Sequence, residues 1–412
     1  MKLFLSLLLT SLFIFPNNLD LNQEIENLNL SSDNYILYSV DADQVVASKN
    51  EDKRIEAASI QKVLTTITAI ELLEGQDLNS EIVADPVIFN GISSKASVAE
   101  LKPNQTYRII DVLHAILLPS GADATRLISY HLTQDPEGLV RYMNQKAQEI
   151  GMEDTQIRNT TGLDMDGQYT TLNDLLKLIQ YAIKNPTFNQ IYSSTDYKFT
   201  NGYETYEFEN LILKEAIDHN FNYLKGAKSG YTTRAGFALS SIAEKDGISF
   251  IFISTRAQVN FVQHTALQDA IKVYDYLFNT YKKEILPNSM LNHEIKVKNR
   301  LNAYTLESRD EISLMVPSNY DSNQLEITYK LNEGILKAPL LKDTLLGNRE
   351  IRYNDQLLLT TDVNTYEDIP KDLFFTLLSI LFWVGIGLIG LISTLFTIGR
   401  VRTHRYRKRM KY

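Results

Sequence analysis

Three short groups of polar residues have the types and spacing needed for chemistry. The first is Ser59-Ile-Gln-Lys62, in which a hydroxyl and an amine are three residues apart. At a helix start, residues i and i+3 share one face, and free backbone N–H groups favour a developing anion. A serine beside a lysine is a nucleophile with a base within reach. Taken alone, the pattern also fits an N-cap serine and a surface lysine.

The other two groups follow later in the chain. Ser120-Gly-Ala122 lies between two segments with helical periodicity, and Lys228-Ser-Gly230 enters a predicted strand. Taken separately, the second group fits a helix cap with a turn, and the third fits a surface loop. The steps between the groups are 61 and 108 residues, and all three rarely occur together by chance. We therefore treat them as parts of one site built around a serine nucleophile.

The composition excludes several other kinds of site. The chain has 412 residues and no cysteine, which excludes disulfides, thiolate zinc sites, iron–sulfur clusters and a cysteine nucleophile. Its six histidines are scattered, with no pair at i,i+4 spacing, so we expect no metal and no cofactor. With 44% hydrophobic and 22% charged residues, the chain has the composition of a folded protein.

The elements that must position these groups switch between strand and helix patterns. Residues 35–48 predict a β-hairpin with its turn at residues 41–43. Apolar residues recur at helical spacing from Ser59, and Gly75 ends that helix. Further helices are predicted at 110–118, 122–132, 138–150, 171–184 and 262–281, and further strands at 237–243 and 248–255.

Strands from both ends of this segment bracket a mostly helical middle. The simplest closure is one antiparallel sheet with a helical insert, which is an α+β fold. We expect this domain to span residues 24–286. From 287 to 370 the pattern changes to short strands, which predicts a small all-β domain.

The charge is distributed unevenly along the chain. The formal net charge is −9, yet the last 13 residues contain seven Lys or Arg and no acid. An acidic body disfavours nucleic acid as a partner. Residues 373–399 carry no charge, and a helix of that length spans about 40 Å, against about 30 Å of hydrocarbon core. We predict a transmembrane helix at 373–399 and a basic cytoplasmic tail at 400–412.

The N-terminus favours the same topology. Lys2 precedes the apolar residues 3–15, which resemble the hydrophobic region of a secretory signal. We take residues 1–20 as a signal-like segment, and because no typical cleavage motif follows, its removal stays open. The positive-inside rule then predicts a cell-membrane protein with a single C-terminal anchor and an extracytoplasmic body.

The order of the three groups resembles the low-molecular-mass penicillin-binding proteins, the serine-type D-Ala-D-Ala carboxypeptidases, which carry S-x-x-K, S-x-N and K-T-G. The resemblance covers roughly residues 30–370 and implies a β-lactamase/transpeptidase-like fold. The stretches that carry it are Ala57-Ala-Ser-Ile-Gln-Lys62, Leu117-Leu-Pro-Ser-Gly-Ala-Asp-Ala124, Met143-Asn-Gln-Lys-Ala147, Ile150-Gly-Met-Glu-Asp-Thr155, Asn159-Thr-Thr-Gly-Leu163, Gly226-Ala-Lys-Ser-Gly-Tyr-Thr232 and Leu336-Lys-Ala-Pro-Leu340.

The resemblance implies a substrate and a role for each residue. Ser59 would attack the carbonyl between the two D-alanines that end a peptidoglycan stem peptide, and Lys62 would accept its proton. Ser120 would relay a proton to the leaving amine. β-Lactams, which mimic the dipeptide, would trap the serine. The residues expected to bind substrate are Lys228, Ser229, Gly230, Tyr231 and Thr232.

Lys62 must be uncharged to act as a base, although a free lysine has a pKa of about 10.4. Burial and the nearby charge of Lys228 are the expected means of lowering that pKa. The backbone N–H groups of Ser59 and, by the resemblance, of Tyr231 would form the oxyanion hole.

Two departures from the family pattern leave alternatives open. The third group reads K-S-G, which keeps the hydroxyl. Ala122 stands where the family usually has asparagine, and its side chain can form no hydrogen bond. Losing one buried hydrogen bond costs about 1–3 kcal/mol, so activity would weaken without being excluded. A catalytically impaired wall-binding or scaffold homologue is therefore an alternative.

A class A β-lactamase is a third interpretation. That class needs a glutamate that activates the deacylating water. Residues 158–163 instead read Arg-Asn-Thr-Thr-Gly-Leu, with no acid followed at short spacing by asparagine. The additional β domain and the anchor also disfavour this class.

Overall fold

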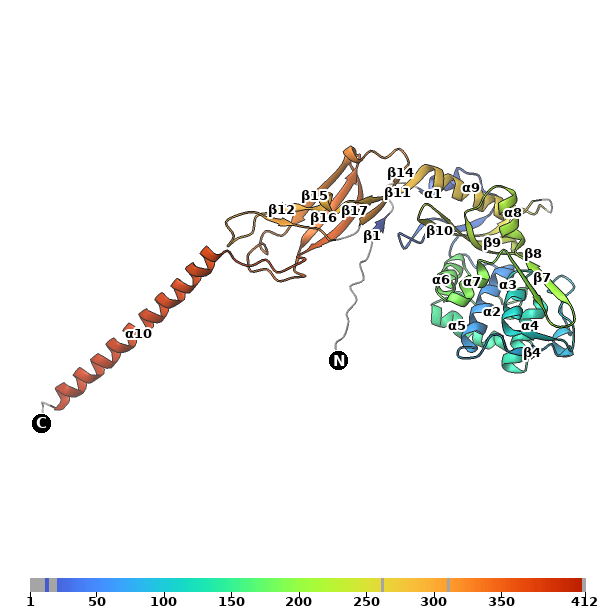
Figure 1. Ribbon diagram of the computed structural model, residues 1–412, viewed down its shortest axis with the longest axis horizontal. Helices are drawn as coiled ribbons and strands as arrows, with labels where there is room; N and C mark the ends of the chain where they lie inside the picture. The colour runs from blue at the N-terminus through green and yellow to red at the C-terminus, as the bar shows by residue number, and fades with distance from the viewer. Residues whose placement is uncertain (1–11, 15–20, 261–262, 310–311, 410–412) are drawn as a thin grey trace.

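The computed structural model describes residues 12–14, 21–260, 263–309 and 312–409, and its parts follow one another in a row (Figure 1). A body of helices around a sheet comes first, a region of short strands second, and one long helix last. Most of the signal-like segment lies outside the described residues. Its described part, β1 (Leu12–Ile14), pairs in parallel with β14 (Ile312–Pro317) of the second region.

The body is built on a five-stranded sheet with the order β3-β2-β10-β9-β8. Every neighbouring pair is antiparallel. The N-terminal hairpin joins the later strands through β2 and β10, which confirms the closure predicted from the two ends of the segment. The strands are β2 (Asn34–Ser39), β3 (Gln44–Lys49), β8 (Leu224–Thr232), β9 (Gly236–Lys245) and β10 (Ile248–Ala257).

Both faces of this sheet are buried, because alternate residues of a strand point to opposite sides. On β2, Ile36 and Tyr38 pack into the cluster that contains the middle helices. Tyr35 and Leu37 pack into a second cluster against α9 (Thr265–Thr280). The second face is also covered by α1 (Leu21–Glu26) and α8 (Leu211–Asp218).

The middle helices surround α2 (Lys62–Leu72). Residues 62–70 of α2 are all buried, which is typical of a helix in the centre of a core. The first residue of α2 is therefore held on all sides. The helices around it are α3 (Ile109–Leu117), α4 (Ala122–Thr133), α5 (Leu139–Ile150), α6 (Leu172–Ala182) and α7 (Pro186–Tyr192). Two strand pairs complete the body: β4 (Glu81–Val83) with β5 (Thr106–Arg108), and β6 (Asp196–Thr200) with β7 (Thr205–Glu209).

The second region is all β. Its first strand, β11 (Tyr281–Leu286), begins directly after α9 and pairs with β14. This strand precedes the boundary expected after residue 286, yet it hydrogen-bonds to the second region. The other strands are β12 (His293–Ile295), β13 (Tyr304–Leu306), β15 (Leu325–Leu331), β16 (Leu345–Tyr353) and β17 (Gln356–Asn364).

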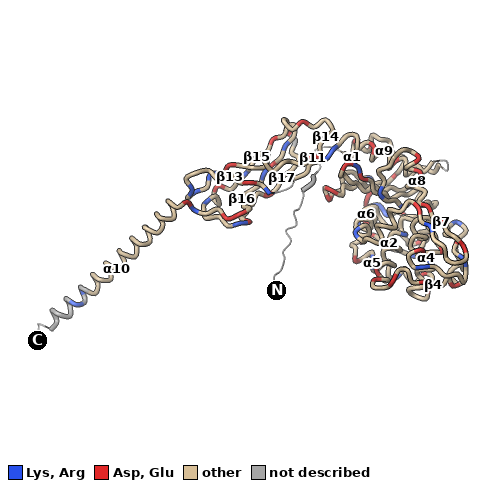
Figure 2. Tube along the Cα trace, viewed as in Figure 1, with Lys and Arg blue, Asp and Glu red and all other residues tan. Residues whose placement is uncertain are grey.

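The chain ends in α10 (Leu373–Arg409), which extends away from both other parts (Figure 1). Its residues Leu373–Ile398 are long and apolar enough to cross a membrane, and none of that stretch is buried against the protein. Figure 2 shows no charged residue along most of this helix, whereas acidic and basic residues are mixed over the body. The predicted transmembrane helix is therefore present as a candidate membrane span.

Candidate active site

Ser59 and Lys62 lie where the 3₁₀ turn η1 (Ala58–Gln61) runs into α2. The Nζ atom of Lys62 lies 3.0 Å from the Oγ atom of Ser59, within hydrogen-bond reach. The sequence predicted a helix from Ser59, but α2 begins three residues later. Ala58, the first residue of the 3₁₀ turn, has a φ of +47°, which neither an α-helix nor a regular 3₁₀ turn accepts, so the backbone is strained directly before Ser59.

Two glycines allow neighbouring backbones to approach the serine closely. A Cβ atom on Gly230 of β8 would lie 2.4 Å from the backbone nitrogen of Ser59. A Cβ atom on Gly162 would lie 2.1 Å from the carbonyl oxygen of Ala58, and Gly162 also has a φ of +81°. No side chain fits at either position, so the turn that carries Ser59 is held between an edge strand and a loop.

Lys62 is buried, with 3% of its surface exposed. Its Nζ atom donates a hydrogen bond of 2.6 Å to the carbonyl of Thr161. Burial lowers the pKa of Lys62 well below its ordinary value, the charge of Lys228 lowers it further, and Asp123 opposes the change. Among the described residues, Lys62 has no ion pair with a carboxylate. The uncharged amine, which can accept a proton, is therefore favoured.

Lys228 lies in the middle of β8, with 4% of its surface exposed. Its Nζ atom donates a hydrogen bond of 2.9 Å to the carbonyl of Ser229. Burial lowers the pKa of Lys228 to about 7, so this amine changes its charge near neutrality. The strand continues through the other expected substrate-binding residues, Gly230, Tyr231 and Thr232.

Ser120 lies in the break between α3 and α4, with a φ of +64°. Its Oγ atom is buried and has no hydrogen-bond partner in the part of the chain that the structure describes. A buried hydroxyl without a partner costs free energy. Its hydroxyl is therefore available to a group that enters the site.

One cavity of about 330 Å³ is lined by all eight residues predicted for the site: Ser59, Lys62, Ser120, Lys228, Ser229, Gly230, Tyr231 and Thr232. The structure thus brings together three groups that are far apart in sequence. The cavity adjoins a hollow of about 570 Å³, and the residues that line both are Lys95, Ala96, Thr161, Leu163, Tyr231 and Thr232. The small side chain of Ala122 lines that hollow.

Sequence reasoning assigned no role to the loop between α5 and α6. This loop supplies Thr161, whose carbonyl accepts from Lys62, and Gly162 beside the turn of Ser59. The side-chain oxygen of Asn159 accepts hydrogen bonds from the N–H groups of Thr161 (3.1 Å) and Gly162 (2.7 Å). An asparagine three residues before a glycine is the sequence signal that could have marked this tight turn.

His264 also lines the cavity but has a structural part in it. Burial lowers the pKa of His264 to about 4, so the ring is neutral at pH 7. Its Nδ1 atom accepts a hydrogen bond of 3.3 Å from the N–H of Leu267 and so caps α9. The ring therefore acts as the N-cap of α9, and we assign it no role in the reaction.

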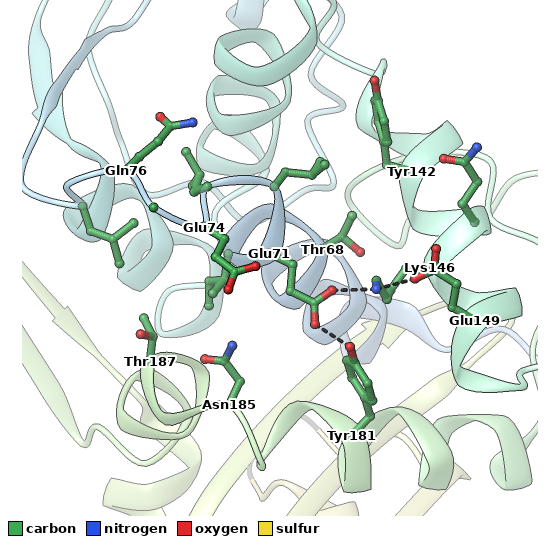
Figure 3. Close-up of a pocket in the computed structure, with 16 residues that line it drawn as sticks. Thr68, Glu71, Glu74, Gln76, Tyr142, Lys146, Glu149, Tyr181, Asn185 and Thr187 are labelled. Atoms are coloured by element: carbon green, nitrogen blue, oxygen red, sulfur yellow. Dashed lines mark hydrogen bonds and ion pairs between the residues drawn. The ribbon is translucent and has the colours of Figure 1, made fainter. Parts of the chain in front are cut away.

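A larger cavity, of about 750 Å³, lies at the other end of α2 (Figure 3). There Lys146 of α5 bridges two carboxylates, Glu71 at 2.7 Å and Glu149. The hydroxyl of Tyr181 donates a hydrogen bond of 2.6 Å to Glu71. Burial opposes the charge of Lys146, but the hydrogen bonds to Glu149 and Glu71 raise its pKa above the ordinary value. This amine stays charged, and none of the eight predicted residues lines this cavity.

Comparisons with known proteins agree with this geometry. A family model described as D-alanyl-D-alanine carboxypeptidase matches residues 21–258. The chain is 26% identical to the D-alanyl-D-alanine carboxypeptidase DacF of Bacillus subtilis, over 83% of this chain and 87% of the relative. It is 28% identical to the D-alanyl-D-alanine carboxypeptidase DacB2 of Mycobacterium tuberculosis, over 59% of this chain and 81% of the relative.

Solved structures share the fold. Penicillin binding protein 5 of Haemophilus influenzae aligns with a TM-score of 0.64 and 19% identity, over 83% of this chain and 98% of that chain. The D-alanyl-D-alanine carboxypeptidase DacD of Francisella tularensis aligns with a TM-score of 0.65 and 20% identity, over 83% of this chain and 94% of that chain. The α+β body and the β region that follows it are therefore both present in known structures.

Proposed function

The chain belongs to the D-alanyl-D-alanine carboxypeptidase family, and we propose that it releases the terminal D-alanine of peptidoglycan stem peptides through an acyl-enzyme on Ser59. Members of this family are serine-type hydrolases of the penicillin-binding class. One observation carries the mechanism: the Oγ atom of Ser59 lies 3.0 Å from the amine of Lys62, whose pKa burial lowers well below its ordinary value.

In the acylation step, Ser59 Oγ bonds to the carbonyl carbon between the two D-alanines. The proton of the hydroxyl passes to the lone pair of Lys62 Nζ. The N–H groups of Ser59 and Tyr231 donate to the oxyanion that forms. The C–N bond then breaks, the leaving amine takes a proton through the hydroxyl of Ser120, and D-alanine departs.

We infer that the substrate binds along the edge strand β8. β8 is the last strand of the sheet, and it passes directly beside Ser59. An extended peptide can add to such an edge through backbone hydrogen bonds. Lys228 and Ser229 would then meet the terminal carboxylate, and the negative charge would favour the protonated form of Lys228.

Deacylation returns the enzyme to its starting state. A water molecule attacks the acyl carbon while Lys62 takes one of its protons, and the released Ser59 oxygen recovers a proton. A β-lactam follows the same acylation step, but its leaving group stays tethered to the acyl part, so its acyl-enzyme persists and inhibits. Among the described residues, the lining of the cavity around Ser59 contains no Asp or Glu, and the carboxylates in the lining of the adjoining hollow are those of Glu137 and Asp164. Glu137 is paired with Arg126, which disfavours a class A β-lactamase, since that class needs a glutamate to activate water.

A membrane anchor would hold this chemistry near its substrate. A charge-free helix followed by basic residues fits a single C-terminal anchor with its tail in the cytoplasm. The body would then lie outside the membrane, where cell-wall precursors are found. A wall-binding homologue without turnover is the second candidate, favoured only by Ala122.

Labelling with a fluorescent penicillin tests the proposal. We expect the unchanged chain to be labelled and Ser59→Ala to remain unlabelled. Equal labelling of both would refute Ser59 as the nucleophile. A second assay measures D-alanine released from diacetyl-Lys-D-Ala-D-Ala. Binding of this peptide without release would favour the wall-binding candidate instead.

A further inference from the structure

The carbonyl of Thr161 is the nearer of the two hydrogen-bond partners that Lys62 Nζ has among the described residues. It lies 2.6 Å from Lys62 Nζ, whereas Ser59 Oγ lies 3.0 Å away. A carbonyl can only accept hydrogen bonds. It therefore takes one N–H of the amine, which limits the lone pair of the uncharged amine to two directions, one of which lets it accept from the hydroxyl of Ser59. The position of this carbonyl sets the orientation of the base.

Glu137, which lies just before α5, fixes the residue next to this carbonyl. Its Oε2 atom accepts a hydrogen bond of 2.8 Å from the backbone N–H of Thr160. The carbonyl of Thr160 in turn accepts a hydrogen bond of 2.9 Å from the hydroxyl of Thr65 on α2. Both peptide groups that flank Thr160 are thus held from outside the loop. Glu137 does not line the cavity that contains Ser59.

Arg126 holds the other oxygen of Glu137. Its Nη1 atom lies 2.7 Å from Glu137 Oε1, and only 13% of the arginine side chain is exposed. The guanidinium also donates to the carbonyls of Ile88 (2.6 Å) and Asn90 (2.9 Å). Each carboxylate oxygen therefore has its own partner, and the arginine is fixed at three points.

We propose that Glu137, held by Arg126, is a positioning residue for Lys62, which it orients through the Thr160–Thr161 backbone. Ala122 lines the same hollow as Glu137 and Thr161. It cannot orient Lys62, because its side chain forms no hydrogen bond. The inference rests on the proposed roles of Ser59 and Lys62 as nucleophile and base.

The test compares Glu137→Ala and Glu137→Gln with Glu71→Ala in the full chain. Glu71 is a matched control, because its ion pair with Lys146 has the same length, 2.7 Å, but lies at the other end of α2. For each variant, acylation by a fluorescent penicillin is followed from pH 5 to 10, and kcat and KM are measured with diacetyl-Lys-D-Ala-D-Ala. Thermal unfolding of each variant gives its stability.

We expect Glu137→Ala to slow acylation and kcat ten- to hundredfold and to leave KM within about twofold. The acid limb of the pH profile should move to lower pH, because the displaced carbonyl no longer favours the charged amine. Glu137→Gln should keep at least a third of the rate, since its amide oxygen still accepts from Thr160. Glu71→Ala should keep the full rate while losing similar stability.

The inference is overturned if Glu137→Ala behaves like Glu71→Ala, or if it raises KM with an unchanged pH profile. If Glu137→Ala does not fold, Arg126→Gln takes its place, with a two- to fivefold slowing and the same direction of pH shift expected. An unshifted profile in that variant would also overturn the inference. Failure of the unchanged chain to acylate or to release D-alanine would instead refute the proposed function.

Discussion

A lysine lies at each end of α2, the buried Lys62 at its start and the half-buried Lys146 of α5 beside its last turn, and the two differ in electrostatic state. At the first residue of the helix, Lys62 touches a hydroxyl and a carbonyl. Near the last turn, Lys146 touches the carboxylates of Glu71 and Glu149. Burial disfavours the charge at both sites. Two differences separate the sites: Lys62 is more deeply buried and has only neutral hydrogen-bond partners, whereas the carboxylates beside Lys146 raise its pKa.

Asp123 lies near Lys62 but forms no ion pair with it among the described residues, whereas Glu71 and Glu149 both pair with Lys146. Asp123 opposes the lowering of the Lys62 pKa, yet its oxygens accept hydrogen bonds from the backbone N–H groups of Ala99 and Leu101, at 2.8 and 3.0 Å. Its own pKa is raised by burial and lowered by those bonds, with a net rise. The carboxylate of Asp123 thus holds the backbone at Ala99 and Leu101, and it forms no ion pair with Lys62 among the described residues.

Removal of the base gives the largest effect that this comparison predicts. Lys62→Ala should slow acylation by penicillin at least a thousandfold, because a positioned base contributes about 10²–10⁴-fold and the nucleophile also loses its hydrogen-bond partner. Lys146→Ala should change the rate less than twofold. Stopped-flow fluorescence measures both. Similar acylation rates for the two variants would contradict the assignment of Lys62 as the base and Lys146 as a structural residue.

The second prediction concerns stability. The pKa of Lys228 is about 7 in the fold and about 10.4 in an unfolded chain. Between these values the unfolded chain binds more protons, so stability rises with pH from about 7 to 10.4. Lys228→Met should stabilise the body by about 3 kcal/mol at pH 7, at 1.36 kcal/mol per pKa unit less the lost hydrogen bond.

Urea denaturation at pH 7 and pH 10 measures this effect. The gain from Lys228→Met should shrink at the higher pH, where the native lysine no longer loses a proton on folding. Lys225→Met, on the same strand, is the control. A gain that did not depend on pH would mean that better packing, and not the lost charge, stabilises the variant.

The third prediction uses the same variant to test the link between the two amines. Lys228→Met removes a like charge, so the pKa of Lys62 should rise and the acid limb of the acylation profile should move to higher pH. We expect a ten- to hundredfold slowing below pH 7, where Lys228 is charged in the native chain. A profile of unchanged shape would mean that burial alone lowers the Lys62 pKa.

The smallest effect is expected at the structural end of α2. Glu71→Lys should destabilise the body by about 1 kcal/mol, since it places two cations together at a partly exposed site. The double variant Glu71→Lys/Lys146→Glu should recover about half of that loss, with acylation unchanged throughout. Thermal unfolding measures the stabilities. No recovery in the double variant would show that packing, rather than the ion pair, fixes this end.

The features that follow from side-chain type and spacing were mostly predicted from the sequence. Spacing i,i+3 placed Lys62 beside Ser59, and the strand patterns at both ends of the body predicted the sheet that brings Lys228 to them. The pairing of β11 with β14 could not be predicted, because the residue pattern of a strand does not determine which other strand it pairs with. The 3₁₀ turn at Ser59 was missed, since an apolar pattern does not distinguish one 3₁₀ turn from the start of an α-helix.

The contribution of Thr161 could not be predicted for a different reason. Its carbonyl belongs to the backbone, and every residue has one. What makes it special is the loop that turns it toward Lys62, and that loop depends on Glu137 and Arg126, which come from other elements. Such a relay is visible only when the distances are known.

Lys228 has a pKa of about 7 inside the cavity. Uptake of a proton from the solvent is therefore linked to the binding of a ligand beside this amine. A carboxylate that docks against it would draw in up to one proton at pH 7 and above. Calorimetric titration in buffers of different ionisation enthalpy would then report heats that differ from one buffer to the next. A heat of binding that is the same in every buffer would show that Lys228 takes up no proton when a carboxylate binds.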